Sequence, residues 1–111
     1  MNRRRGSCVI VICNDKVPEG FAVVHELRKE GHKAELLYFF GEHKSLKSLM
    51  RIADRLNMLD VVVLGNAEFE TRKFKVRDME TGETEEFDLS KLSEVLKDRN
   101  AYEKKPSALN L

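Results

Sequence analysis

The sequence predicts a single α/β domain in which helices cover a sheet with a parallel core. Two short runs, residues 7–13 and 60–65, are apolar at consecutive positions, as in strands that are buried on both faces. Segments with helical spacing of apolar residues alternate with these strands, which favours right-handed crossovers between parallel strands. With 111 residues, the chain has room for one hydrophobic core.

The first half of the chain follows this alternation. The predicted elements are a strand at 7–13, a turn at 14–16, a helix at 18–31, a strand at 33–39, a helix at 45–57 and a strand at 60–65. Pro18 suits the first position of a helix, where its missing N–H would lack a partner in any case. Gly31 suits the left-handed cap that ends many helices.

After the third strand the pattern becomes that of an antiparallel hairpin. Phe74 and Val76 alternate with charged residues, which predicts a half-exposed strand. Residues 80–83 form the predicted turn, because Gly82 can adopt a positive φ, and residues 84–87 form a second short strand.

Both ends of the chain are predicted to be tails. Residues 1–6 are rich in arginine and are expected to form a basic, flexible tail, a solvated terminus rather than a nucleic-acid arm. Asp88 suits the N-cap of a last helix, whose apolar stripe consists of Leu89, Leu92, Val95 and Leu96. Residues 100–111 are polar and are expected to form a C-terminal tail, so the predicted domain spans residues 7–99.

Composition narrows the function classes. The 20 lysine and arginine residues nearly balance 19 aspartate and glutamate residues, so any electrostatic attraction must come from local patches. No apolar run approaches the roughly 20 residues of a membrane span. Cys8 and Cys13 are expected on opposite faces of one strand, where they cannot form a disulfide. This favours a reduced, cytoplasmic setting.

The helix at residues 45–57 carries two distinct faces. Its apolar stripe consists of Leu46, Leu49, Met50, Ala53 and Leu56, as expected of a core-facing surface. Its other face carries a basic ridge, which consists of Lys44, Lys47, Arg51 and Arg55. Such a ridge alone is most simply a solvated helix face, and the alternative is a surface that binds an anionic partner.

An aromatic cluster, residues 38–40, precedes this helix. Three consecutive rings cannot all point inward from a strand, so part of the cluster is expected to be exposed. Exposed rings beside lysine and arginine are typical of surfaces that bind single-stranded RNA, since bases stack on rings while cations hold phosphates.

The residues predict neither a cofactor nor a metal site. The turn after the first strand lacks the glycines of a phosphate-binding loop. His25, His32 and His43 lack cysteine or carboxylate partners at metal-ligand spacing and are interpreted as surface residues. Asp15 follows the first strand, where α/β enzymes place site residues, but without a second catalytic group we interpret it as a turn or capping residue.

Several segments together point to a known family. They are residues 25–31 (HELRKEG), 45–47 (SLK) with 53–56 (ADRL), 61–65 (VVVLG) followed by Glu68, and 76–83 (VRDMETGE). In order and spacing the sequence resembles the anticodon-binding domain of class II aminoacyl-tRNA synthetases, closest to the C-terminal domain of histidyl-tRNA synthetase. The resemblance implies a three-layer α/β/α domain with a mixed five-stranded sheet, strand order 2-1-3-4-5, and strand 4 antiparallel.

The resemblance also implies a set of RNA contacts. In this family, bases are contacted by a basic residue of the second helix, a glutamate after the third strand and a basic residue of the following strand. These roles fall on Arg51, Glu68 and Arg77. His43 lies near a further polar contact position, and Lys44 and Lys47 supply phosphate charge. We call these six the predicted contact residues.

The function implied is that of a non-catalytic tRNA anticodon-binding module, stand-alone or excised from a histidyl-tRNA-synthetase-like protein. Its implied partners are the anticodon stem-loop of a tRNA and a class II synthetase catalytic core, and a homodimer is left open. One alternative is a regulatory or accessory protein-interaction subunit derived from a synthetase domain, with residues 39–40 as a docking patch. Another is a small α/β enzyme that uses Asp15.

The sequence departs from the family pattern at several positions. The connection at residues 38–44 is longer than usual, which affects the register of His43 and Lys44. Residues 71–72 replace a turn that resembles Asn-Gly, and residues 59–60 replace a pair of proline and an aromatic residue.

Overall fold

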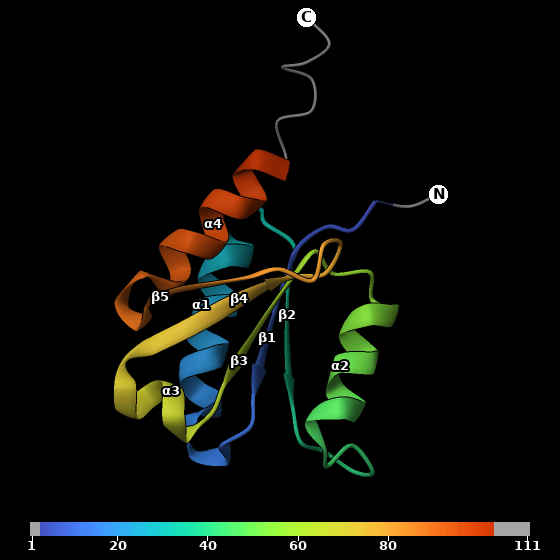
Figure 1. The fold of residues 1–111 in the computed structure, drawn as a ribbon, viewed down its shortest axis with the longest axis vertical. Helices are drawn as coiled ribbons and strands as arrows, with labels where there is room; N and C mark the ends of the chain where they lie inside the picture. The colour runs from blue at the N-terminus through green and yellow to red at the C-terminus, as the bar shows by residue number, and fades with distance from the viewer. Residues whose placement is uncertain (1–2, 104–111) are drawn as a thin grey trace, which may run out of the picture.

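Helices cover both faces of a five-stranded mixed sheet in the order β2-β1-β3-β4-β5 (Figure 1). The arrangement is seen in a computed structural model, which describes residues 3–103. The elements are β1 (Ser7–Val11), η1 (Asn14–Lys16), α1 (Val17–Lys29), β2 (Ala34–Tyr38), α2 (Leu46–Arg55), β3 (Asp60–Leu64), α3 (Asn66–Thr71), β4 (Lys73–Asp78), β5 (Thr84–Asp88), η2 (Leu89–Lys91) and α4 (Leu92–Glu103). The predicted three-layer fold and its strand order are confirmed.

The sheet combines a parallel core with an antiparallel hairpin. β1 pairs in parallel with β2 and with β3, and the helices α1 and α2 make the two crossovers. β4 runs antiparallel to both β3 and β5. The change of direction follows the change in sequence pattern after β3, where continuous apolar runs give way to alternation of apolar and charged residues.

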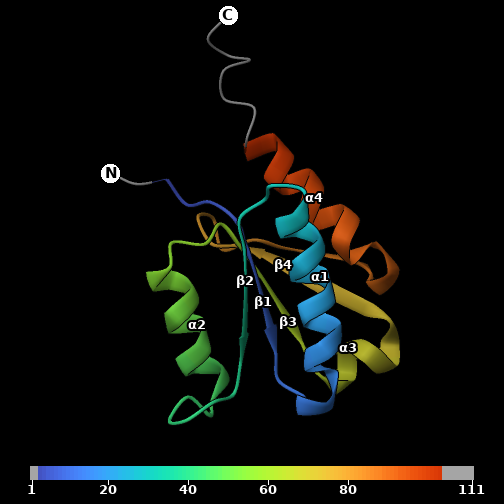
Figure 2. The same cartoon turned by 180° about the vertical axis from the view of Figure 1, so that it is seen from behind.

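Two hydrophobic cores lie on the two sides of the sheet. On one side, which we call the α1/α4 side, α1 and α4 pack over Val9, Val11 and the inward residues of β3 and β4. On the other, the α2 side, α2 packs over Cys8 and Ile10. Figure 2 shows α1 and α4 together on one side and α2 alone on the other. Successive side chains of β1 point to opposite faces of the sheet, and this determines which core each residue enters.

The two cysteines lie in different cores. Cys8 belongs to the α2 side and Cys13, beyond the end of β1, to the α1/α4 side, and both are free thiols. The expectation that they do not bridge is confirmed. Burial, with a smaller effect from Glu35, raises the pKa of Cys8 to about 12.

Gly31 and Asp88 act as the predicted capping residues, and Ser45 caps a further helix end. Gly31, with φ 85°, ends α1 in the left-handed conformation. The hydroxyl of Ser45 accepts from the backbone N–H of Ser48 at 3.1 Å, which fixes the start of α2. Asp88 caps the last helical segment by accepting from the N–H of Ser90 at 2.9 Å.

A short helix, α3, follows β3, and the sequence pattern did not predict it. Phe69 packs against the α1/α4 core, which is too little apolar surface to give a visible helical stripe. The helix ends at Arg72, which adopts the left-handed conformation with φ 62°. An arginine is an uncommon residue for this conformation, in which glycine and asparagine are favoured.

The chain before β1 is held against the turn between α2 and β3. The backbone N–H of Arg5 donates to the carbonyl of Asn57 at 3.0 Å, and the Arg4 guanidinium pairs with the Asp54 carboxylate. Within the segment expected to be a flexible tail, residues 1–6, Arg4 and Arg5 thus contact the domain, and the first two residues lie outside the described residues. Arg4, which the sequence suggests is a solvated charge, has a carboxylate partner in the last turn of α2.

The C-terminal helix continues further than the sequence suggests. Asn100 is 4% exposed, and its Nδ2 donates to the hydroxyl of Ser7 at 2.9 Å and to the carbonyl of Leu96 at 2.8 Å. The polar tail expected over residues 100–111 is therefore wrong for its first four residues, and the last eight lie outside the described residues. The predicted domain, residues 7–99, ends inside α4.

A buried acidic group joins this network. Asp60 is 1% exposed and accepts from the guanidinium of Arg99 and, at 3.2 Å, from the hydroxyl of Ser7. Arg99 also donates to the carboxylate of Asp78 at 3.0 Å. Burial raises the pKa of Asp60 above its ordinary 3.8, while the charge and hydrogen bond of Arg99 oppose that rise.

Candidate functional site

The basic ridge lies on the outer surface of α2. Its members, Lys44, Lys47, Arg51 and Arg55, are all exposed. Leu49 and Ala53, by contrast, are completely buried against the sheet. Arg51 is two positions from each of these residues, about 200° around the helix axis, so it points away from the sheet. The ridge is thus free to contact a partner across the α2 side of the molecule.

Glu68 is the third residue of α3 and caps that helix. Its Oε1 accepts from the backbone N–H of Gly65 at 2.7 Å, and its side chain is half-buried. The carboxylate has a second oxygen, which can accept a further hydrogen bond. The geometry therefore gives Glu68 a structural role beside the predicted base contact. The sequence signal for the cap was the polar stretch that opens with Gly65 and places a glutamate three residues later.

Arg77 lies on the α2 side of β4. Phe74 and Val76 enter the α1/α4 core, so the alternating basic residues Lys73, Lys75 and Arg77 face the other way and are exposed. No described residue of β4 or β5 belongs to the core beneath α2, so this part of the sheet stays uncovered.

The cross-strand pairing distinguishes the basic residues of β4. Lys75 lies opposite Glu86, whereas Arg77 lies opposite Thr84, which carries no charge. A cross-strand carboxylate offsets the charge of a lysine beside it. Arg77 therefore offers the less compensated positive charge to a partner.

The predicted contact residues lie near opposite ends of the strands. Arg77 lies beside Val61 at the start of β3, whereas Glu68 lies beyond the end of the same strand. At about 3.3 Å per residue, the positions of Val61 and Gly65 are about 13 Å apart. Arg77 and Glu68 therefore do not meet at one point of the sheet, and one partner that contacts both must extend along β3.

His43 lies in the connection between β2 and α2, just before α2 begins. Its Nδ1 is within hydrogen-bond distance of the hydroxyl of Ser48, and its ring contacts that of Phe40, with centroids 4.9 Å apart. Phe39 packs into the core beneath α2, while Tyr38 and Phe40 are exposed. The expectation that the three aromatic residues cannot all point inward is confirmed.

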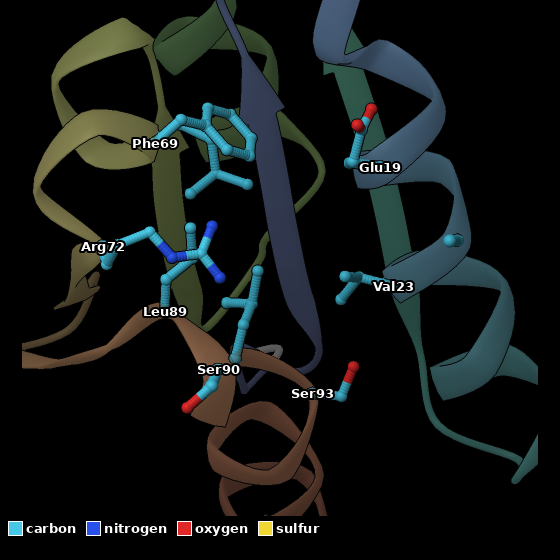
Figure 3. Close-up of a pocket in the computed structure, with 10 residues that line it drawn as sticks. Glu19, Val23, Phe69, Arg72, Leu89, Ser90 and Ser93 are labelled. Carbon is cyan, nitrogen blue, oxygen red and sulfur yellow. The ribbon is translucent and has the colours of Figure 1, made fainter.

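A pocket of about 280 Å³ lies on the α1/α4 side, between α1, α3 and the start of α4. Figure 3 shows the guanidinium of Arg72 extending into it between Phe69 and Leu89, across from Val23 and Glu19 of α1. None of the six predicted contact residues lines this pocket. The one sign of Arg72 in the sequence is that residues 71–72 replace a turn that resembles Asn-Gly.

Two features are absent from residues 3–103. Within this range, no group of three or more histidine, cysteine, aspartate or glutamate side chains is placed to hold a metal ion. None of the helices described there is both long and apolar enough to cross a membrane. Asp15 lies exposed in η1, as expected of a turn residue.

Comparison with known proteins gives a consistent result. A family model described as "Anticodon binding domain" matches residues 7–99. The histidine–tRNA ligase of Bacillus velezensis is 36% identical over 91 residues, which cover 81% of this chain and 21% of that protein. The chain spans about a fifth of the length of the curated relatives it matches.

Solved structures agree with the sequence matches. The crystal structure of apo S. aureus histidyl-tRNA synthetase aligns with a TM-score of 0.75 at 28% identity, over 86% of this chain and 24% of that chain. The RNA binding domain of threonyl-tRNA synthetase from Cryptosporidium parvum aligns with a TM-score of 0.66 at 21% identity, over 85% of this chain and 23% of that chain. At that identity the second likeness concerns the fold alone.

Proposed function

We propose that this chain, which belongs to the family of anticodon-binding domains, is a non-catalytic module that binds the anticodon stem-loop of a tRNA. The observation that carries the proposal is the family match over residues 7–99, most of the described chain. The exposed basic ridge on α2 supports it, because a row of lysine and arginine side chains attracts the phosphates of a nucleic acid.

Within this proposal, the predicted contact residues divide by chemistry. Lys44 and Lys47 hold phosphates as point charges. Arg51 and Arg77 engage phosphates or base edges through a guanidinium fork. The free oxygen of Glu68 accepts from base amino or imino groups, which distinguishes bases in a way that phosphate attraction does not. His43 adds a polar contact at the start of α2.

The proposed partner is a stem-loop long enough to follow the α2 side. A contact at Glu68 and another at Arg77 require it to extend along β3, as the register places these residues about 13 Å or more apart. An RNA hairpin exceeds this separation in both width and length, so one hairpin can reach both residues.

The second proposed partner is a class II synthetase catalytic core. The chain matches only about a fifth of the length of these relatives, and their names describe ligases. We propose that aminoacylation belongs to a catalytic core outside these residues, in another chain or another part of the same protein. The two buried free cysteines fit a reducing compartment such as the cytoplasm.

Titration of a fluorescently labelled anticodon hairpin of histidine tRNA tests the proposal. We expect saturable binding that weakens in the Arg51→Ala variant. Lys91→Ala is the matched control, because Lys91 is an exposed cation on the α1/α4 side and its loss changes the net charge equally. Binding that does not saturate at low salt, or that Arg51→Ala and Lys91→Ala change alike, would contradict the proposal.

A further inference from the structure

Three aromatic side chains lie in ring contact at the end of β2, of which Tyr38 and Phe40 are exposed and His43 is half-buried. The rings of Tyr38 and Phe40 have centroids 6.4 Å apart, and those of Phe40 and His43 4.9 Å apart. Tyr38 is 41% exposed and Phe40 is 49% exposed, so large apolar faces remain in contact with water. We call Tyr38, Phe40 and His43 the ring strip.

The backbone holds the ring strip in place. The N–H of Phe40 donates to the carbonyl of His43 at 3.0 Å, and the N–H of His43 donates back to the carbonyl of Phe40 at 2.7 Å. Phe39, between the exposed rings, packs into the core beneath α2 and anchors the segment. The hydroxyl of Ser48 in α2 fixes the His43 imidazole. The rings are therefore preorganised on the surface, which lowers the entropic cost of binding a planar ligand.

The ring strip lies next to the start of the basic ridge. Lys44 follows His43 directly, and Lys47 lies one helical turn further along α2, with both side chains exposed. Glu42 is exposed in the same turn, so two lysines outweigh one carboxylate there. Planar rings beside a net positive charge match a ligand that combines flat bases with a phosphate backbone.

We propose that the ring strip is a stacking platform for unpaired bases of the bound RNA, with Lys44 and Lys47 holding the adjoining phosphates. This inference rests on the proposed function and adds a contact surface to it. The strip begins on the α1/α4 side, where the alternation of β2 places Tyr38 with Ala34 and Leu36, and it ends at the first turn of α2. Bases that reach it therefore wrap around the outer end of edge strand β2.

The test uses hairpins that carry 2-aminopurine at single positions of the loop, since its fluorescence is quenched on stacking. We expect Phe40→Ala and Tyr38→Ala each to weaken hairpin binding about tenfold and to abolish the quenching at one loop position. Phe21→Ala is the matched control, because Phe21 is 53% exposed but lies on α1, and it is expected to bind as the native chain does.

Salt dependence separates stacking from charge. We expect Phe40→Leu, which keeps apolar bulk without a ring, to lose affinity while retaining the native slope of log Kd against log salt. Lys44→Ala is expected to lower that slope by about one. Far-ultraviolet circular dichroism and thermal melts of each variant verify that it is folded.

The outcomes distinguish the two proposals. Native affinity and native quenching in folded Phe40→Ala and Tyr38→Ala, with weaker binding in Arg51→Ala, would overturn the platform and leave the proposed function standing. Failure of the native chain to bind any hairpin would overturn both. Loss of a copurifying protein from these variants, with hairpin binding intact, would assign the ring strip to protein docking and overturn the platform.

Discussion

Oε1 of Glu68 accepts a hydrogen bond from the backbone N–H of Gly65, 2.7 Å away. The carboxylate proposed to contact bases thus also holds the first turn of α3, directly after β3. The two roles use different oxygens, and they make different demands on the side chain. The cap needs an acceptor, whereas a contact to base donors is strengthened by a full negative charge.

Two substitutions of Glu68 separate these roles. Glu68→Gln keeps an amide oxygen for Gly65 and is expected to change the free energy of unfolding by less than about 0.5 kcal/mol. Glu68→Ala removes the acceptor and is expected to cost about 1 kcal/mol. Both variants are expected to weaken hairpin binding, as measured by fluorescence titration beside urea denaturation. If Glu68→Gln binds as tightly as the native chain, Glu68 acts as a cap without reading bases.

The pairing of β4 with β5 leads to a prediction for its basic residues. Arg77→Ala is expected to weaken hairpin binding more than Lys75→Ala, because Lys75 lies opposite Glu86 and Arg77 opposite the uncharged Thr84. Each substitution removes one positive charge from the same exposed face, so the pair controls for net charge. Titrations at several salt concentrations would measure both. Equal losses of hairpin affinity in the two variants would mean that β4 attracts the RNA only through its overall positive charge and that Arg77 makes no particular contact.

The sequence predicts the layout of this fold well, for identifiable reasons. Continuous apolar runs mark β1 and β3, and the capping residues Gly31 and Asp88 mark helix ends, because these signals depend on local chemistry. Family resemblance adds the strand order, which local patterns do not determine. The resemblance itself is confirmed by the family match over residues 7–99.

What the sequence does not predict depends on contacts between distant residues. Asn100 reads as the start of a polar tail, yet it donates to Ser7, which lies 93 positions away in the chain. Arg4 reads as a solvated charge, yet it pairs with Asp54. For the site, sequence and resemblance name the predicted contact residues, but the register alone reveals that Arg77 and Glu68 lie toward opposite ends of β3.

The buried pair of Asp60 and Arg99 predicts a pH-dependent variant. Arg99→Met leaves the Asp60 carboxylate without its guanidinium, which is expected to cost about 3 kcal/mol of unfolding free energy at pH 7. The pKa of Asp60 already lies above 3.8, chiefly because of burial, and it rises further when Arg99 is absent. An acid whose pKa is raised in the folded state contributes most to stability at pH values below its pKa in the unfolded state. That contribution is lost as the pH rises through its pKa in the folded state.

The contact between Arg99 and Asp78 also makes the destabilisation by Arg99→Met larger at pH 7 than at low pH. Burial raises the pKa of Asp78, but backbone hydrogen bonds and Arg99 outweigh burial and hold it below 3.8, so its contribution to stability is lost as pH falls. Arg99→Met weakens that contribution. The destabilisation by Arg99→Met is therefore expected to be larger at pH 7 than near pH 4 in urea denaturation. Lys91→Met, which breaks the exposed pair with Glu94, serves as control. A cost of Arg99→Met that does not vary with pH would contradict the assignment.

Asn100 provides a direct test of the extended domain. Asn100→Ala removes a donor from the buried hydroxyl of Ser7 and is expected to lower the unfolding free energy by about 1 to 2 kcal/mol. Asp98→Ala, at an exposed position of the same helix, is the matched control and is expected to have little effect. Thermal or urea denaturation measures both. Equal stability of the two variants would contradict the claim that Asn100 belongs to the folded domain.

The central claim is that the α2 side of this domain binds an anticodon stem-loop. Its most direct test is the change in backbone amide chemical shifts of the ¹⁵N-labelled chain during titration with an unlabelled anticodon hairpin. We expect saturable changes concentrated at residues 38–51, at Glu68 and at Arg77, with little change along α1 and α4. Changes that do not saturate, or that centre on α1, α4 and the pocket between them, would contradict the claim.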